Sequence, residues 1–182
     1  RHKKRPVCDE LGYNAFMKFA EFAEYLEKLE ATSSRLALIE ILSELFKKTP
    51  SAEIEKIVYL IQGRIAPFFE PTEIGMAEKN VAASIANAFG SNKEDVLRLY
   101  QKLGDMGLAA LQLSQKSKVK SQNLTVGVAF EILAQIAKTS GEGTVEKRQT
   151  LLSGLLGKVD AVSAKHLVRV PLGNTRLGIG DP

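Results

Sequence analysis

Residues 19–30 read Phe-Ala-Glu-Phe-Ala-Glu-Tyr-Leu-Glu-Lys-Leu-Glu, and they decide the fold class. Their apolar side chains recur at intervals of three and four residues, which is the period of one face of an α-helix. The four glutamates of the stretch follow one flank of that helix, where we interpret them as a solvated face; they are Glu21, Glu24, Glu27 and Glu30. A helix with one buried stripe is therefore expected here.

The helical period extends over most of the chain. Ser51 and Asn92 stand before periodic stretches as N-caps, while Pro50, Gly63 and Gly104 end others. The later helices are expected at residues 36–46, 52–62, 74–89, 93–103, 108–115 and 124–138, from about 144 to 156, and at 163–172. Because no stretch alternates in the period of a β-strand, we predict an all-α domain.

The two ends of the chain carry similar apolar patterns. Arg35, Leu38, Ile39 and Leu42 are matched by Arg148, Leu151, Leu152 and Leu155, and Phe22, Leu26 and Leu29 by Ala129, Leu133 and Ile136. The separation between matched positions varies from 103 to 113 residues, so the loops differ in length. Two copies of roughly 60 residues are too few for a solenoid, so we predict a compact domain with an internal pseudo-two-fold repeat of helical units.

Composition limits the chemistry that the chain can carry. The 182 residues are 45% hydrophobic and 25% charged, which suits one domain with a good core, and no apolar run reaches the ~18 residues of a membrane span. A single cysteine, Cys8, excludes an internal disulfide. Two histidines, His2 and His166, are too few for a histidine-based metal or catalytic cluster, and we expect His166 to be solvated.

The two termini differ from the body of the chain. Residues 1–16 begin with a basic cluster and lack the helical period that starts at Met17, so we interpret them as a leader, foreign to the domain or disordered, and residues 17–182 as the domain. The alternative is a basic arm that binds nucleic acid. Asp181 and Pro182 have the form of a helix start, which indicates that the domain is cut from a longer protein.

Three loops are candidate anion sites, two of them in the second half, where residues 98–182 carry a net charge of +6. Gly141, Gly143 and Thr144 offer N–H groups and a hydroxyl at a helix start, with Lys147 and Arg148 close behind, and this combination suits a phosphate. The others are Ser33, Ser34 and Arg35 at the matching place in the first copy, and Gly173, Arg176 and Gly178, where an arginine could enter the minor groove of DNA. The plainer readings are exposed helix connections and a tight turn.

No coherent catalytic set is visible. Walker-type, Rossmann and metal-binding motifs are absent, and the run from Lys158 to Ala161 falls one residue short of the Lys-x-Asp-Gly motif of nucleotidyltransferases. We therefore predict no catalytic residue, cofactor or metal for this chain itself.

Six motifs occur in an order and spacing that resemble one known family. They are Phe19-x-x-Phe22-x-x-x-Leu26-x-x-Leu29-Glu30-x-Thr32, Ser33-Ser34-Arg35, Glu73-Ile74-Gly75-Met76-Ala77-Glu78-Lys79, Gly104-Asp105-Met106-Gly107-Leu108-Ala109, Gly141-Glu142-Gly143-Thr144-x-x-Lys147, and Gly173-Asn174-x-Arg176-Leu177-Gly178-Ile179-Gly180. Over residues 17–182 the chain resembles the N-terminal DNA-binding domain of archaeal and eukaryotic ATP-dependent DNA ligases.

This resemblance implies a helical domain that grips double-stranded DNA in the minor groove on both sides of a nick, through the three loops above. It also implies that ATP and Mg²⁺ are bound by an adenylation domain, followed by an OB-fold domain, outside this chain. Sealing of nicks in replication, repair and recombination would follow, inside the cell: in the cytoplasm of a prokaryote or the nucleus of a eukaryote.

The alternative is a helical protein-interaction scaffold with an apolar groove. Phe68 and Phe69 would form a surface patch in a scaffold and pack inward in a DNA-binding domain. Glu53, at the start of an expected helix, should tolerate replacement by lysine in the DNA-binding domain.

Overall fold

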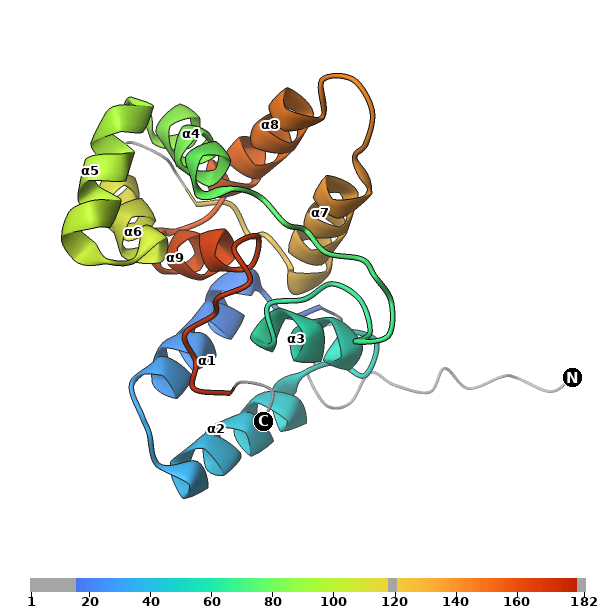
Figure 1. The fold of residues 1–182 in the computed structure, drawn as a ribbon. Helices are drawn as coiled ribbons and strands as arrows, with labels where there is room; N and C mark the ends of the chain where they lie inside the picture. Colours follow the sequence, from blue (N-terminus) through green and yellow to red (C-terminus); the bar gives the residue numbers. More distant parts are fainter. Residues whose placement is uncertain (1–15, 118–120, 180–182) are drawn as a thin grey trace, which may run out of the picture.

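The computed structural model describes residues 16–117 and 121–179, which form nine α-helices and no β-strand. In chain order they are α1 (Phe19–Glu30), α2 (Arg35–Lys48), α3 (Ile54–Ile61), α4 (Glu78–Phe89), α5 (Lys93–Leu103), α6 (Met106–Lys116), α7 (Val126–Lys138), α8 (Thr144–Leu156) and α9 (Ala161–Arg169). The predicted all-α class is confirmed. In Figure 1, α1, α2 and α3 lie at one end of the structure and α4, α5, α6 and α8 at the other.

Local signals set many of the helix ends. α5 has the bounds that the sequence predicts, because the Asn92 side chain accepts the Asp95 N–H at 2.8 Å and Gly104 ends the helix in the left-handed conformation, with φ of 68°. Asp105 and Asp160 cap α6 and α9 in the same way as Asn92. These caps provide acceptors for N–H groups that a helix start leaves without backbone partners.

Three helices start later than the sequence predicts, and a tertiary contact accounts for the largest of these differences. α4 begins at Glu78 and not at residue 74, since Ile74 and Met76 are buried ahead of the helix and the Met76 N–H donates to the Pro171 carbonyl at 3.1 Å. α3 begins at Ile54 and not at residue 52, and α7 begins at Val126 and not at residue 124. The contact ahead of α4 leaves no local mark in the sequence.

α1 buries the stripe that its period predicts. Phe19, Phe22, Leu26 and Leu29 are each at most 4% exposed, and the first two rings meet edge to face with centroids 5.6 Å apart. Truncating one such aromatic ring to alanine costs about 3–5 kcal/mol. The core is thus organised around α1 and the helix that covers it.

That covering helix is α9, which lies between α6 and α1 (Figure 1). All residues from 163 to 169 are buried, including Lys165, His166 and Arg169. Gly107 allows α6 to approach closely, because a Cβ at that position would lie 2.6 Å from the Lys165 carbonyl oxygen. The expectation of a solvated His166 is therefore wrong, since its side chain is 3% exposed and packed inside the domain.

α1 and α7 start side by side. The Phe19 N–H donates to the Leu124 carbonyl at 2.7 Å, and the Val126 N–H donates to the Met17 carbonyl at 2.9 Å. The members of these two bonds are related by the 107-residue separation that the sequence repeat shows in this region. In addition, α1 packs on α9 while α7 packs on α3. These reciprocal contacts are compatible with a pseudo-two-fold arrangement, and the internal repeat stays a prediction.

Within the part of the chain that the structure describes, no helix combines the length and the apolar character required to cross a membrane.

Candidate nucleic-acid interface

The two predicted phosphate loops belong to the starts of α2 and α8. Figure 1 places the connection from α1 to α2 and the connection from α7 to α8 at opposite ends of the structure. The structure therefore does not bring the two loops into one site. It presents them as two separate exposed helix starts.

The first loop is an exposed N-cap. The Ser34 hydroxyl accepts the Ala37 N–H at 3.4 Å, and the Ser34 N–H donates to the Thr32 hydroxyl at 3.1 Å. Ser33, Ser34 and Arg35 are all exposed. The dipole of the 14-residue helix α2 adds partial positive charge at this end.

The second loop is shaped by two left-handed glycines. Gly141 and Gly143 have φ of 84° and 71°, values that other residues adopt only with strain. The Thr144 hydroxyl donates to the Gly141 carbonyl, and Lys147 Nζ reaches back to donate to the Glu142 carbonyl at 3.1 Å. Lys147 thus lies over the loop at the start of α8, as a phosphate ligand would require, while the carboxylate of Glu142 adds negative charge beside it.

Arg148 does not belong to this site, although the sequence places it beside Lys147. Its guanidinium donates to the carbonyls of Ile74, Ala137 and Thr139 at 3.0–3.3 Å. It ties α8 to the end of α7 and to the segment before α4, and therefore has a structural role.

The third loop, residues 173–178, combines positive φ angles with an anchored arginine. Gly173 and Gly178 have φ of 65° and 66°, and no atom lies within 4 Å of a Cβ built on either. Arg176 is partly exposed, and its Nη2 donates to the Gly104 carbonyl at 2.5 Å while its Nε lies 3.6 Å from Asp105. The glycines are required by backbone conformation, and Arg176 is held by the turn between α5 and α6.

A set of charged side chains, here called the ionic cluster, connects α1, α6, α9 and the third loop. Its members are Glu27, Glu30, Asp105, Lys165, Arg169 and Arg176. Arg169 is 2% exposed and donates to Glu30 at 2.8 and 3.0 Å and to both oxygens of Asp105. Lys165 contacts two carboxylates of the cluster: its Nζ lies 2.5 Å from Glu27 Oε1 and 2.8 Å from Glu30 Oε2. Three acidic groups balance three basic groups, which offsets the cost of burying Asp105, Lys165 and Arg169. Glu27 and Glu30 are therefore not the simple solvated face that the sequence indicated.

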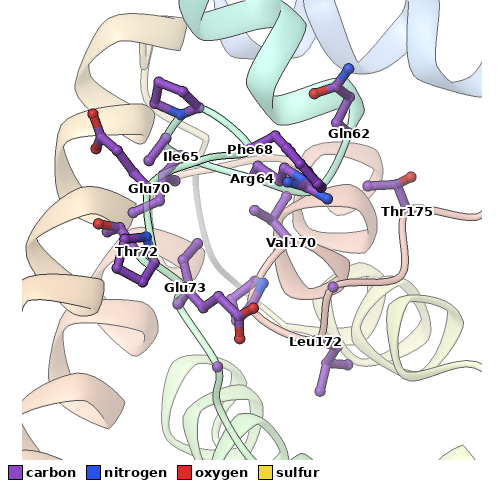
Figure 2. A pocket seen from close by; sticks show the side chains of 18 of the residues that line it. Gln62, Arg64, Ile65, Phe68, Glu70, Thr72, Glu73, Val170, Leu172 and Thr175 are labelled. Carbon is purple, nitrogen blue, oxygen red and sulfur yellow. The ribbon is translucent and has the colours of Figure 1, made fainter. Parts of the chain in front are cut away.

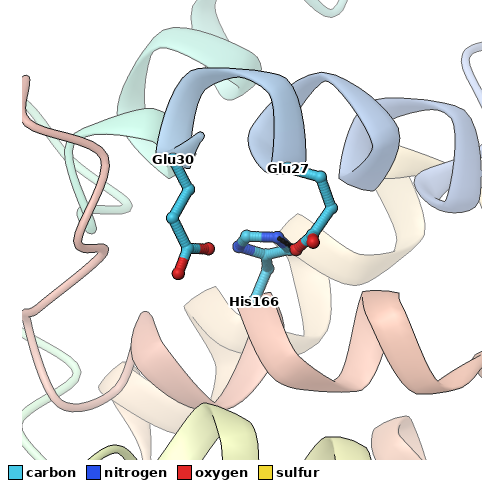
Figure 3. A group of neighbouring side chains, drawn as sticks. All are labelled: Glu27, Glu30 and His166. Atoms are coloured by element: carbon cyan, nitrogen blue, oxygen red, sulfur yellow. Dashed lines mark hydrogen bonds and ion pairs between the residues drawn. The ribbon is translucent and has the colours of Figure 1, made fainter. Parts of the chain in front are cut away.

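His166 lies beside this cluster. Figure 3 shows His166 and the carboxylates of Glu27 and Glu30 between α1 and α9, and their potential ligand atoms lie within 4.8 Å of one another. Lys165 and Arg169 already neutralise both carboxylates, so the group is poorly suited to a metal ion. Burial lowers the pKa of His166 to about 4, despite its hydrogen bond to Glu27 at 2.6 Å, so the imidazole is neutral at pH 7.

A groove of about 760 Å³ lies between the connection from α3 to α4 and the segment after α9 (Figure 2). Phe68 and Phe69, at its edge, are 81% and 82% exposed, and the guanidinium of Arg64 lies 5.2 Å from the Phe68 ring centroid. The pair is therefore exposed, as the sequence analysis expects of a protein-interaction scaffold and not of a DNA-binding domain. The connection is long and crosses the surface, and both rings stay exposed although the Arg64 guanidinium lies over Phe68.

Comparison with known proteins identifies the family. The family model described as "DNA ligase N terminus" matches residues 18–182, so the chain belongs to the N-terminal domain family of DNA ligases. The resemblance drawn from the six motifs is thereby confirmed. At the level of individual relatives, the chain is 41% identical over 151 residues to "Probable DNA ligase" of Dictyoglomus turgidum, an alignment that covers 83% of this chain and 25% of that protein.

Two further relatives agree. The chain is 38% identical over 165 residues to "DNA ligase 1" of Methanosarcina mazei, covering 91% of this chain and 28% of that protein. It is also 38% identical over 160 residues to "DNA ligase" of Saccharolobus solfataricus, covering 82% and 27%. The chain thus spans about a quarter of the length of these relatives.

Proposed function

We propose that the chain is the non-catalytic double-stranded DNA-binding module of a DNA ligase, which grips the minor groove and the phosphates around a nick. The observation that carries the proposal is the pair of exposed helix starts at α2 and α8, set at opposite ends of one domain of the ligase family. Each start directs N–H groups and partial positive charge outward, which suits one phosphate run on either side of a nick. The third loop adds Arg176 as a minor-groove contact.

Other steps of ligation are assigned to the rest of the parent protein. We propose that an adenylation domain and an OB-fold domain bind ATP and Mg²⁺ and seal the nick in replication, repair and recombination inside the cell. Two features of this chain argue against a nucleotide or metal site of its own. Asp160 of the near-match to Lys-x-Asp-Gly is the N-cap of α9, where its carboxylate accepts from the Ser163 N–H and hydroxyl at 3.0 and 2.7 Å. In the group formed by Glu27, Glu30 and His166, both carboxylates already form ion pairs with Lys165 or Arg169.

Fluorescence anisotropy with nicked duplex tests the proposal. Affinity should come mainly from phosphate contacts and fall steeply between 50 and 200 mM salt, by roughly tenfold or more, with weak sequence preference. Lys147→Glu should weaken binding to any duplex and flatten the salt slope by about one unit, since one phosphate contact is lost.

The matched control is Lys47→Glu, the same charge reversal on the exposed surface near the other end of α2, ~18 Å from Arg35 along the helix axis. Salt-insensitive binding, or no binding at low salt, would refute the DNA-binding function. Equal effects of Lys147→Glu and Lys47→Glu would refute the assignment of the loop before α8.

A second candidate is a protein-docking surface, because Phe68 and Phe69 are exposed beside the groove. Changing both residues to serine should leave DNA affinity unchanged if they serve a protein partner, and weaken it if they contact DNA. Anisotropy on the same nicked duplex distinguishes the two outcomes.

A further inference from the structure

Asp105 links the buried Arg169 to the third loop. It is the N-cap of α6, is 4% exposed, and accepts the Gly107 N–H at 2.7 Å. Its carboxylate also accepts from Arg169, on α9, and faces Arg176 Nε at 3.6 Å. One carboxylate therefore joins the start of α6, the central helix and the loop.

Arg176 needs such an anchor because its backbone is strained. With φ of 57°, it is the one non-glycine residue with positive φ in the described part of the chain. This conformation is unfavourable for a residue with a side chain and persists only where surrounding contacts impose it. Here the contacts are the hydrogen bond from Nη2 to the Gly104 carbonyl at 2.5 Å and the ion pair with Asp105.

The two anchoring contacts use one edge of the guanidinium. No described residue makes a hydrogen bond or ion pair with Nη1, and the Arg176 side chain is 45% exposed. Because a guanidinium is planar and rigid, fixing Nε and Nη2 also fixes the direction of Nη1. The anchor therefore determines where the free edge points.

We propose that Asp105 is a positioning residue for DNA binding, which orients Arg176 and holds residues 173–178 in their binding conformation. The inference rests on the proposed DNA-binding function. Arg169 connects Asp105 to Glu30 on α1, so the loop is fixed in position relative to the core of the domain. Asp105 itself touches no DNA in this scheme.

The direction in which one substitution changes DNA affinity distinguishes a positioning role from a direct electrostatic effect. Asp105→Asn keeps the size of the side chain and an acceptor for Gly107, and it removes one negative charge close to the proposed DNA surface. Direct electrostatics would then strengthen DNA binding. Loss of positioning would weaken it.

The experiment measures affinity for nicked duplex by anisotropy at one salt concentration, with circular dichroism to confirm folding. Asp105→Asn and Arg176→Ala should each weaken binding about fivefold or more, and the double variant should bind no more weakly than Arg176→Ala alone, since Asp105 acts through Arg176. The control is Asp160→Asn, which removes the same charge from another N-cap carboxylate, one that makes no contact with an arginine. It should bind as the unmodified chain does, or slightly more tightly.

Each other outcome has a definite meaning. If Asp105→Asn binds normally while Arg176→Ala is weakened, the positioning role is refuted and the DNA-binding function stands. The role is also refuted if the effect of Asp105→Asn persists in the Arg176→Ala background, or if Arg176→Ala binds normally while Lys147→Glu is weakened. If the unmodified chain does not bind nicked DNA, both proposals fail.

A further variant covers the case in which Asp105→Asn does not fold. Arg176→Lys keeps the exposed charge and lacks the planar two-point anchor. Weakening equal to that of Arg176→Ala supports positioning, and normal binding refutes it.

Discussion

Replacing Glu53 should destabilise the domain strongly, although the sequence suggested that this position would tolerate lysine. The side chain is 2% exposed, and its two oxygens accept the Met17 N–H at 2.6 Å and the Gly127 N–H at 3.0 Å. It therefore joins the start of α3 to the starts of α1 and α7. The sequence gives no sign of this junction, because both hydrogen-bond partners are distant in the chain.

The magnitude follows from the two N–H groups. Each buried donor left without an acceptor costs about 1–3 kcal/mol, and the Gly127 N–H is only partly buried, so Glu53→Ala should lower the free energy of unfolding by about 2–5 kcal/mol. Glu53→Gln retains one acceptor oxygen and should lose about half as much. With a urea m-value of about 2 kcal/mol/M for a domain of this size, the Glu53→Ala midpoint should fall by about 1–2.5 M.

Urea unfolding followed by circular dichroism at 222 nm measures this shift. The control is Glu40→Ala, an exposed glutamate on α2, which should change the free energy of unfolding by no more than about 0.5 kcal/mol. If Glu53→Ala unfolds at the same urea concentration as Glu40→Ala, the two hydrogen bonds contribute nothing, and the proposed junction of three helix starts is refuted.

Three further predictions concern the centre of the fold. His166 has a pKa of about 4 in the folded state, below its unfolded value of about 6.5. Its contribution to stability is therefore complete above pH 6.5 and should be lost as pH falls toward 4, by at most about 3 kcal/mol. In the His166→Gln variant, the urea midpoint should depend less on pH across this range. Glu30 should cause a further loss of stability at lower pH. Burial would raise its pKa, but hydrogen bonds from Arg169 and Lys165 hold the pKa at about 2, so its contribution to stability should disappear between pH 4.5 and 2. The stability of Glu30→Gln, which lacks this carboxylate, should decline less over the same range. Gly107→Ala should destabilise the domain by about 1–3 kcal/mol, since its Cβ would lie 2.6 Å from the Lys165 carbonyl oxygen. Gly154→Ala, whose Cβ would have no neighbour within 4 Å, should stabilise the domain by about 0.5–1 kcal/mol. Thermal melts should therefore show a lower melting temperature for the first variant and a higher one for the second.

Features governed by neighbouring residues could be predicted from the sequence. The bounds of α5 follow from Asn92 and Gly104, and the exposed starts of α2 and α8 follow from Ser34 and the glycines before Thr144. The helix class and the buried stripe of α1 depend on period alone, and both are confirmed.

Features governed by distant partners could not be predicted. Arg169 meets Glu30 across 139 positions and Asp105 across 64, so the sequence analysis assigned Glu30 to a solvated face and gave Arg169 and Asp105 no role in the fold. Arg148 was grouped with Lys147 for the same reason, although its partners are backbone carbonyls of other elements. One local signal for Asp105 was available: an acidic N-cap directly after a helix-ending glycine.

The central position of α9 has a consequence for synthesis on the ribosome. α1 emerges early, but the helix that covers its apolar face is the last of the nine described, and Glu30 and Arg169 are separated by 139 residues. At 5–20 residues per second, roughly 7–28 s pass before Arg169 exists to meet its partner. During that interval the Phe19 and Phe22 side chains have no native cover from α9, so nascent chains that stop before Ala161 should be held by chaperones or degraded, and the domain should complete its fold only once α9 has left the exit tunnel.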